Sequence, residues 1–88
     1  MNQPVNTHPA VLAAIERFEG GQSALARHLH VFPQAIDSWK RCKKKVPAKH
    51  CAPIEAATGI RCEELRPDLT WTRNMAGEIT GYHVKVQT

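Results

Sequence analysis

Three short amphipathic segments follow one another in the first forty residues, and their shortness is the strongest constraint on the fold. The first begins at Pro9, ends before Gly20, and carries apolar residues at helical spacing: Val11, Leu12, Ile15 and Phe18. A second helix is predicted over 22–29, and a third opens at Pro33. Helices this short do not persist alone in water, so we expect them to pack on one another.

Two further helices are predicted after a basic connection that ends at Val46. Pro47 suits the first position of a fourth helix, and Gly59 suits the cap at its end. This helix is expected to turn three residues inward: Cys51, Ile54 and Ala57. A short fifth helix over 61–65 follows, and Pro67 ends it.

The composition changes after Asp68. Tyr82, Val84 and Val86 alternate with polar residues, which is the period of a half-buried strand. We therefore expect either a β-hairpin that turns near Ala76 or a disordered tail. The predicted organisation is an N-terminal arm (1–8), a helical domain (9–68) and a C-terminal extension (69–88). The predicted fold class is mainly α, with four to five helices.

Length and cysteine content exclude several classes of protein. The chain has 88 residues, enough for one small domain, and no apolar run approaches the roughly 20 residues of a membrane span. The first residues lack the basic and apolar regions of a signal peptide. Cys42, Cys51 and Cys62 are odd in number and do not have zinc-ligand spacing, so we expect reduced thiols, no metal and no cofactor in a cytoplasmic protein.

Positive charge is concentrated in one segment. Residues 34–50 contain six basic residues against one acidic residue, Asp37, whereas the whole chain carries +4. A basic cluster beside a suitable helix pair indicates a nucleic-acid partner.

The helix pair itself carries a recognisable motif. The stretch QSALARHLHVFPQAIDSWKR (22–41) resembles the helix-turn-helix of Cro/cI-type phage repressors. Ala26 must be small there because the helices cross closely, and apolar contacts fix their angle: Leu25, Leu29, Val31, Ile36 and Trp39. Trp39 is accordingly expected in the core. His30 stands where such motifs usually have glycine, and Phe32 stands where Ser or Thr would cap the next helix.

The resemblance continues beyond the motif. The stretches VPAKHCAPIEAATG (46–59) and CEELRPD (62–68) are similar to the second half of YdaS-type prophage regulators, a Cro-like family often labelled antitoxin. Together the matching stretches cover roughly residues 11–71. The resemblance implies a compact helical DNA-binding domain that acts as a transcriptional regulator of bacterial or prophage origin.

The motif assigns candidate roles to individual residues. The helix over 33–41 is the expected recognition helix, and its outward residues are the predicted base contacts: Pro33, Gln34, Asp37, Ser38 and Arg41. Asp37 is expected either to accept from a cytosine amine or to restrain a neighbouring arginine. The predicted phosphate contacts are Gln22, Ser23, Lys40, Lys43, Lys44 and Lys45.

These observations predict a Cro-like repressor that binds double-stranded DNA sequence-specifically and associates with the nucleoid. It is expected to act as a homodimer or higher even oligomer on a pseudo-palindromic operator. The dimer contact is assigned to residues 69–86, with Ile54 or Leu65 as the competing site. An alternative function is a protein-interaction module or an antitoxin that acts through a protein partner. No arrangement of catalytic residues is apparent, so an enzyme is not expected.

Overall fold

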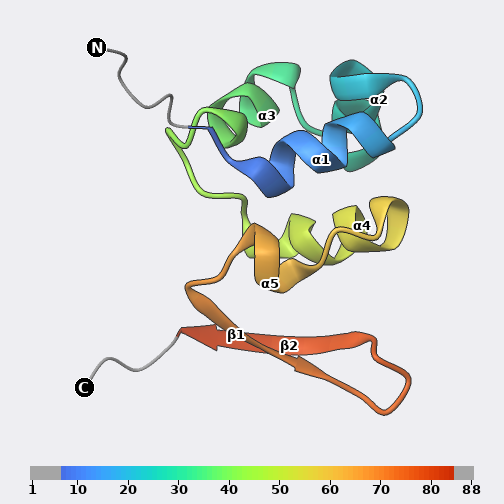
Figure 1. Ribbon diagram of the computed structural model, residues 1–88, viewed down its shortest axis with the longest axis vertical. Helices are drawn as coiled ribbons and strands as arrows, with labels where there is room; N and C mark the ends of the chain where they lie inside the picture. The colour runs from blue at the N-terminus through green and yellow to red at the C-terminus, as the bar shows by residue number, and fades with distance from the viewer. Residues whose placement is uncertain (1–6, 85–88) are drawn as a thin grey trace.

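The computed structural model describes residues 7–84, in which five helices are followed by one antiparallel hairpin (Figure 1). The elements are α1 (Pro9–Arg17), α2 (Gly21–Leu29), α3 (Pro33–Lys40), α4 (Ala48–Thr58), α5 (Cys62–Leu65), β1 (Leu69–Arg73) and β2 (Ile79–Val84). The predicted mainly helical fold is confirmed, and of the two expectations for the C-terminal segment the hairpin is the one observed. None of the helices within 7–84 is long and apolar enough to cross a membrane.

The helices share one core, which lies between the α1–α3 layer and the α4–α5 pair. Trp39 is 4% exposed and Ile36 is fully buried, so the inner side of α3 is held against α1 and α2. The remaining core is aliphatic or sulfur-containing and is drawn from every helix: Ala10, Val11, Ala14, Leu25, Ala26, Leu29, Val46, Cys51, Ile54, Ile60, Cys62 and Leu65. The expected core role of Trp39 is confirmed.

Two expectations for α4 are wrong. Pro47 is the residue that precedes the helix, not its first residue, and Ala57 is exposed. Each helical residue advances about 100°, so Ala57 has rotated roughly 120° away from Cys51 after six residues. The expected cap at Gly59 is present, because Gly59 adopts a left-handed conformation with φ of 80° and ends the helix.

The hairpin closes through an asparagine-centred turn. β1 and β2 pair antiparallel with Leu69 opposite Val84 and Trp71 opposite Tyr82. In the turn, Oδ1 of Asn74 accepts hydrogen bonds from the backbone N–H groups of Ala76 and Glu78 at 2.9 and 3.0 Å. Val86, which was predicted to continue the strand, lies outside the described residues.

An arginine fixes the hairpin to the helices. The Arg73 guanidinium donates to both carboxylate oxygens of Glu55 on α4, at 2.8 Å each, and to both of Glu63 on α5, at 2.7 and 3.1 Å. Trp71 adds a hydrogen bond from Nε1 to the Arg66 carbonyl at 3.1 Å. The hairpin is therefore packed on α4 and α5, at the end of the molecule opposite α2 and α3 (Figure 1).

Replacing Trp39 should destabilise the domain more than replacing Trp71. Trp39→Ala leaves a cavity at the centre of the core and is expected to lower the free energy of unfolding by about 3–5 kcal/mol, most of the stability of a small domain. Trp71 is only half-buried, so Trp71→Ala serves as the matched control with a smaller loss. Chemical denaturation of the two variants checks this, and equal losses would contradict it.

Acid should weaken the attachment of the hairpin. Hydrogen bonds from Arg73 lower the pKa of both Glu55 and Glu63 from 4.5 to about 2. A lowered folded-state pKa adds stability above pH 4.5, and this stability is lost as the pH falls toward 2. We expect urea-unfolding free energies to fall between pH 5 and pH 3, and to fall less steeply in Arg73→Gln. Arg27→Gln is the control, because Arg27 is exposed and forms no ion pair with any residue of 7–84. The same acid dependence in Arg73→Gln and wild type would refute this role of Arg73.

Candidate nucleic-acid interface

The turn between α2 and α3 depends on a residue in an unusual backbone conformation. His30 ends α2 with φ of 59° and ψ of 42°, so the left-handed conformation expected at this position is present. The next residue, Val31, donates from its backbone N–H to the Ala26 carbonyl at 3.0 Å. Because α2 ends so abruptly, the turn that joins it to α3 contains only a few residues, and α3 lies on the surface.

The first turn of α3 is built without a side-chain cap. Phe32 precedes the helix in an extended conformation, its side chain makes no capping hydrogen bond, and Pro33 occupies the first helical position. The missing cap was expected from the sequence. Proline compensates in part, because its fixed φ suits the first turn and it has no N–H to satisfy.

The end of α3 differs from the prediction by one residue. The expected recognition helix spans 33–41, but α3 ends at Lys40 and Arg41 is the capping residue. Cys42 then takes a left-handed conformation with φ of 61°, and the Lys43 backbone N–H donates to the Ser38 carbonyl at 2.8 Å. This hydrogen bond closes the helix in the manner of a Schellman motif, for which glycine is the usual residue. No glycine marked the stop in the sequence.

A polar chain crosses from α2 along α3. Gln22 donates from Nε2 to the Pro33 carbonyl and accepts from the Lys40 ammonium at Oε1, both at 3.2 Å. Asp37 lies 3.5 Å from Lys40 Nζ and 3.0 Å from Arg41 Nε. The hydrogen bond from Arg41 holds the pKa of Asp37 below its usual value. Of the two roles predicted for Asp37, the structure contains the restraint of an arginine.

The predicted base-contacting residues share one side of α3. Pro33, Gln34 and Arg41 are exposed, and Asp37 and Ser38 are half-buried. Four of the predicted residues border one shallow hollow together with Phe32: Gln22, Pro33, Gln34 and Asp37. Ser23 is exposed on α2 next to Gln22 but does not border the hollow.

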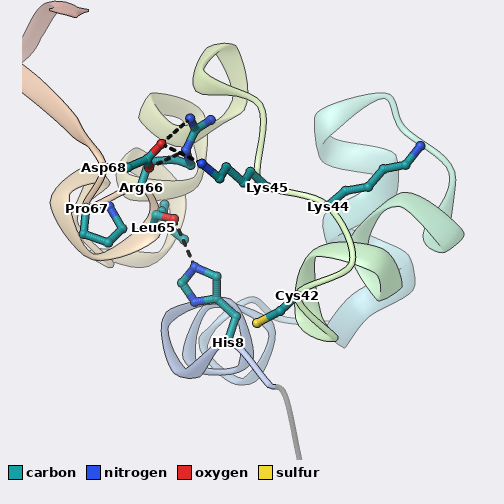
Figure 2. Close-up of a pocket in the computed structure, with 8 residues that line it drawn as sticks. All are labelled: His8, Cys42, Lys44, Lys45, Leu65, Arg66, Pro67 and Asp68. Atoms are coloured by element: carbon teal, nitrogen blue, oxygen red, sulfur yellow. Dashed lines mark hydrogen bonds and ion pairs between the residues drawn. The ribbon is translucent and has the colours of Figure 1, made fainter. Parts of the chain in front are cut away.

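The lysines after α3 have different surroundings. Lys45 Nζ lies 3.1 Å from Asp68, whose other partner is Arg66, so this lysine belongs to the end of α5. Figure 2 shows Lys44 extending in a different direction from Lys45. Lys43 and Lys44 are exposed and form no ion pair with any residue of 7–84.

Two histidines have structural roles that sequence reasoning missed. His8 donates from its backbone N–H to the Lys40 carbonyl at 2.9 Å, and its ring Nε2 lies 3.0 Å from the Leu65 carbonyl (Figure 2). It thereby joins the end of α3 to the end of α5. His50 is half-buried against Trp39, with ring centroids 5.7 Å apart, and burial lowers the pKa of His50. No local pattern in the sequence marked either contact.

Two of the three cysteines fit the expected structural role. Cys51 and Cys62 are buried free thiols, and burial raises the pKa of each to about 12. Cys42 is exposed at the end of α3. Within residues 7–84, no three histidine, cysteine or carboxylate side chains are arranged to hold a metal ion.

The comparisons with known proteins agree with this geometry. A family described as "Bacterial toxin YdaS" matches residues 11–74, which is more than half of the chain. The chain belongs to the YdaS family. This confirms the resemblance inferred from the sequence. The match begins within α1, includes the other four helices and β1, and ends before β2.

Two relatives of this YdaS-family chain carry informative names. A protein of Escherichia coli (strain K12), named as a transcriptional regulator, YdaS, is 47% identical over 55 residues, which cover 60% of this chain and 56% of that protein. The chain thus matches little more than half the length of this relative. The solved structure of a Cro protein from a prophage element of Xylella fastidiosa strain Ann-1 is 44% identical, with a TM-score of 0.59, over 67% of this chain and 91% of that one.

Proposed function

We propose that this chain is a DNA-binding transcriptional regulator that inserts α3 into the major groove of an operator and acts as a Cro-like repressor. The observation that carries the proposal is the two-sided character of α3. Ile36 and Trp39 bury its inner side, while Gln34 and its neighbours leave an outer side of hydrogen-bonding groups open to solvent. A helix fixed in this way can present side chains to base edges.

The polar chain at the start of the motif supports the same docking. Gln22 connects the first turn of α2 to both ends of α3, so the two helices would approach DNA as one rigid unit. The first turn of α2 also offers backbone N–H groups and Ser23 for phosphate contacts. Because Asp37 is engaged by Lys40 and Arg41, its charge opposes phosphate less than a free carboxylate would.

Affinity is assigned mainly to the lysines that have no acidic partner. Lys43 and Lys44 follow α3 directly and can reach the DNA backbone without breaking an ion pair. Lys45, although in the predicted phosphate-contact set, must first leave Asp68. The names of the relatives, a transcriptional regulator and a Cro protein, support a DNA partner.

We further propose a homodimer, since one small module buries too little surface for useful affinity and two recognition helices about 34 Å apart match one turn of DNA. β2 has an open edge, and its side chains Tyr82 and Val84 are 53% and 71% exposed. The competing contact through Ile54 or Leu65 is disfavoured, because these residues are 2% and 1% exposed within one chain.

A protein-interaction module or an antitoxin that acts through a protein partner is the second candidate function. The exposed apolar side chains of β2 favour it, because a foreign protein could cover them as well as a second copy. The two candidates differ in their dependence on duplex DNA, which the first of the following experiments measures.

Replacing single lysines should lower the charge-dependent part of the DNA affinity without changing the base preference. Lys43→Ala and Lys44→Ala are each expected to weaken binding to specific and random duplexes about equally. Each should also reduce the slope of log affinity against log salt by roughly one unit. Lys45→Ala should change the slope less, and Arg61→Gln is the distant control. Salt titrations by fluorescence anisotropy measure this. If wild-type protein binds no duplex at any salt concentration, the protein-partner function is favoured.

Base recognition should depend on the outer side of α3. Gln34→Ala and Ser38→Ala are expected to leave folding intact while relaxing base preference, each by about 1–3 kcal/mol at the contacted pair. Glu19→Ala, an exposed residue just beyond α1, is the control. Selection of binding sites from random duplexes measures the preference. Unchanged consensus sequences for both α3 variants would mean that another surface contacts the bases.

A charge on β2 should dissociate the dimer. Val84→Lys places an ammonium where the second copy is expected and should shift the chain to monomer without unfolding it. Ala57→Lys introduces the same charge on the exposed side of α4 and should leave the dimer intact. Sedimentation equilibrium of the full chain distinguishes these outcomes. A dimer that persists in Val84→Lys but not in Ala57→Lys would move the interface to α4.

A further inference from the structure

Phe32 is an exposed aromatic residue whose side chain is neither packed in the core nor able to cap α3. Its side chain is 80% exposed, and it makes no capping hydrogen bond to α3 although it precedes the first turn. Serine, threonine, asparagine or aspartate would stabilise the helix at this position. The hydrophobic effect also disfavours leaving the ring in water. The residue is therefore a candidate for a function outside folding.

The surroundings of Phe32 indicate what it faces. It borders the shallow hollow formed with Gln22, Pro33, Gln34 and Asp37, at the junction of the first turns of α2 and α3. In a docked helix-turn-helix, the N-terminal residues of the recognition helix are the ones that contact base edges. Phe32 thus borders the same hollow as Gln34, on the side of the molecule that the proposed function turns toward DNA.

The major groove presents one strongly apolar group, the 5-methyl group of thymine, and a phenyl ring is among the side chains that can contact it. Phe32 and the Pro33 ring together offer an apolar surface next to the amide of Gln34, a group that can pair with adenine. We propose that Phe32 determines specificity by packing against the 5-methyl group of a thymine next to the base contacted by Gln34. This inference rests on the proposed function.

Deoxyuridine tests the contact, because it differs from thymidine only in lacking that methyl group. An operator selected by the full chain is prepared with each thymine replaced singly by deoxyuridine, and dissociation constants are measured by anisotropy at one salt concentration. Wild type should lose about fourfold in affinity at one thymine in each half-site, the effect of one methyl group removed from an apolar contact.

Variants separate recognition from stability. Phe32→Ala should bind the thymine and deoxyuridine duplexes equally, and Phe32→Ser should do the same while melting at a higher temperature because it restores the cap. Leu12→Ala, an exposed apolar residue on α1, should keep the fourfold difference. Retention of the methyl effect by Phe32→Ala, or no methyl effect in wild type, would overturn this inference alone. Failure of wild type to bind any duplex would instead overturn the proposed function as well.

Discussion

Burial of Ile36 and Trp39 against α1 and α2 is the constraint on which the rest of the structure depends. α3 has eight residues and would not stay helical alone, so its inner side chains determine both that it forms and which way it faces. Once these two residues are in the core, Gln34, Asp37 and Ser38 fall on the opposite side. The proposed interface is therefore a consequence of packing and does not require a separate binding element.

Polar contacts connect the helices that this packing has already brought together. Gln22 and Asp37 connect the surface residues of α2 and α3, and His8 connects the end of α3 to α5. At the other end, Arg73 holds the hairpin to Glu55 and Glu63. The molecule thus has two separate surfaces, one for the proposed DNA contact and one for the proposed second copy. Their separation allows β2 to be altered without changing α3.

The sequence predicted the features that arise from local spacing. The helices and the core position of Trp39 follow from residues a few positions apart. The left-handed turn at His30 and the missing cap at Phe32 were expected from the resemblance to the Cro/cI-type motif. The sequence did not predict the pairing of Lys45 with Asp68 or the packing of His50 on Trp39, because these contacts join segments whose approach depends on the assembled helices. It also placed the end of α3 one residue too late, since the stop at Cys42 uses a residue that rarely adopts φ of 61°.

The outer side of α3 is the proposed DNA-binding surface, and an NMR titration of the full, isotope-labelled chain with its operator duplex tests this most directly. Backbone amide signals of residues 33–41 and of the first turn of α2 should shift most, with smaller shifts over 43–44. Amides of α5 should remain almost unchanged. Large shifts confined to β1 and β2, with α3 unaffected, would contradict the account.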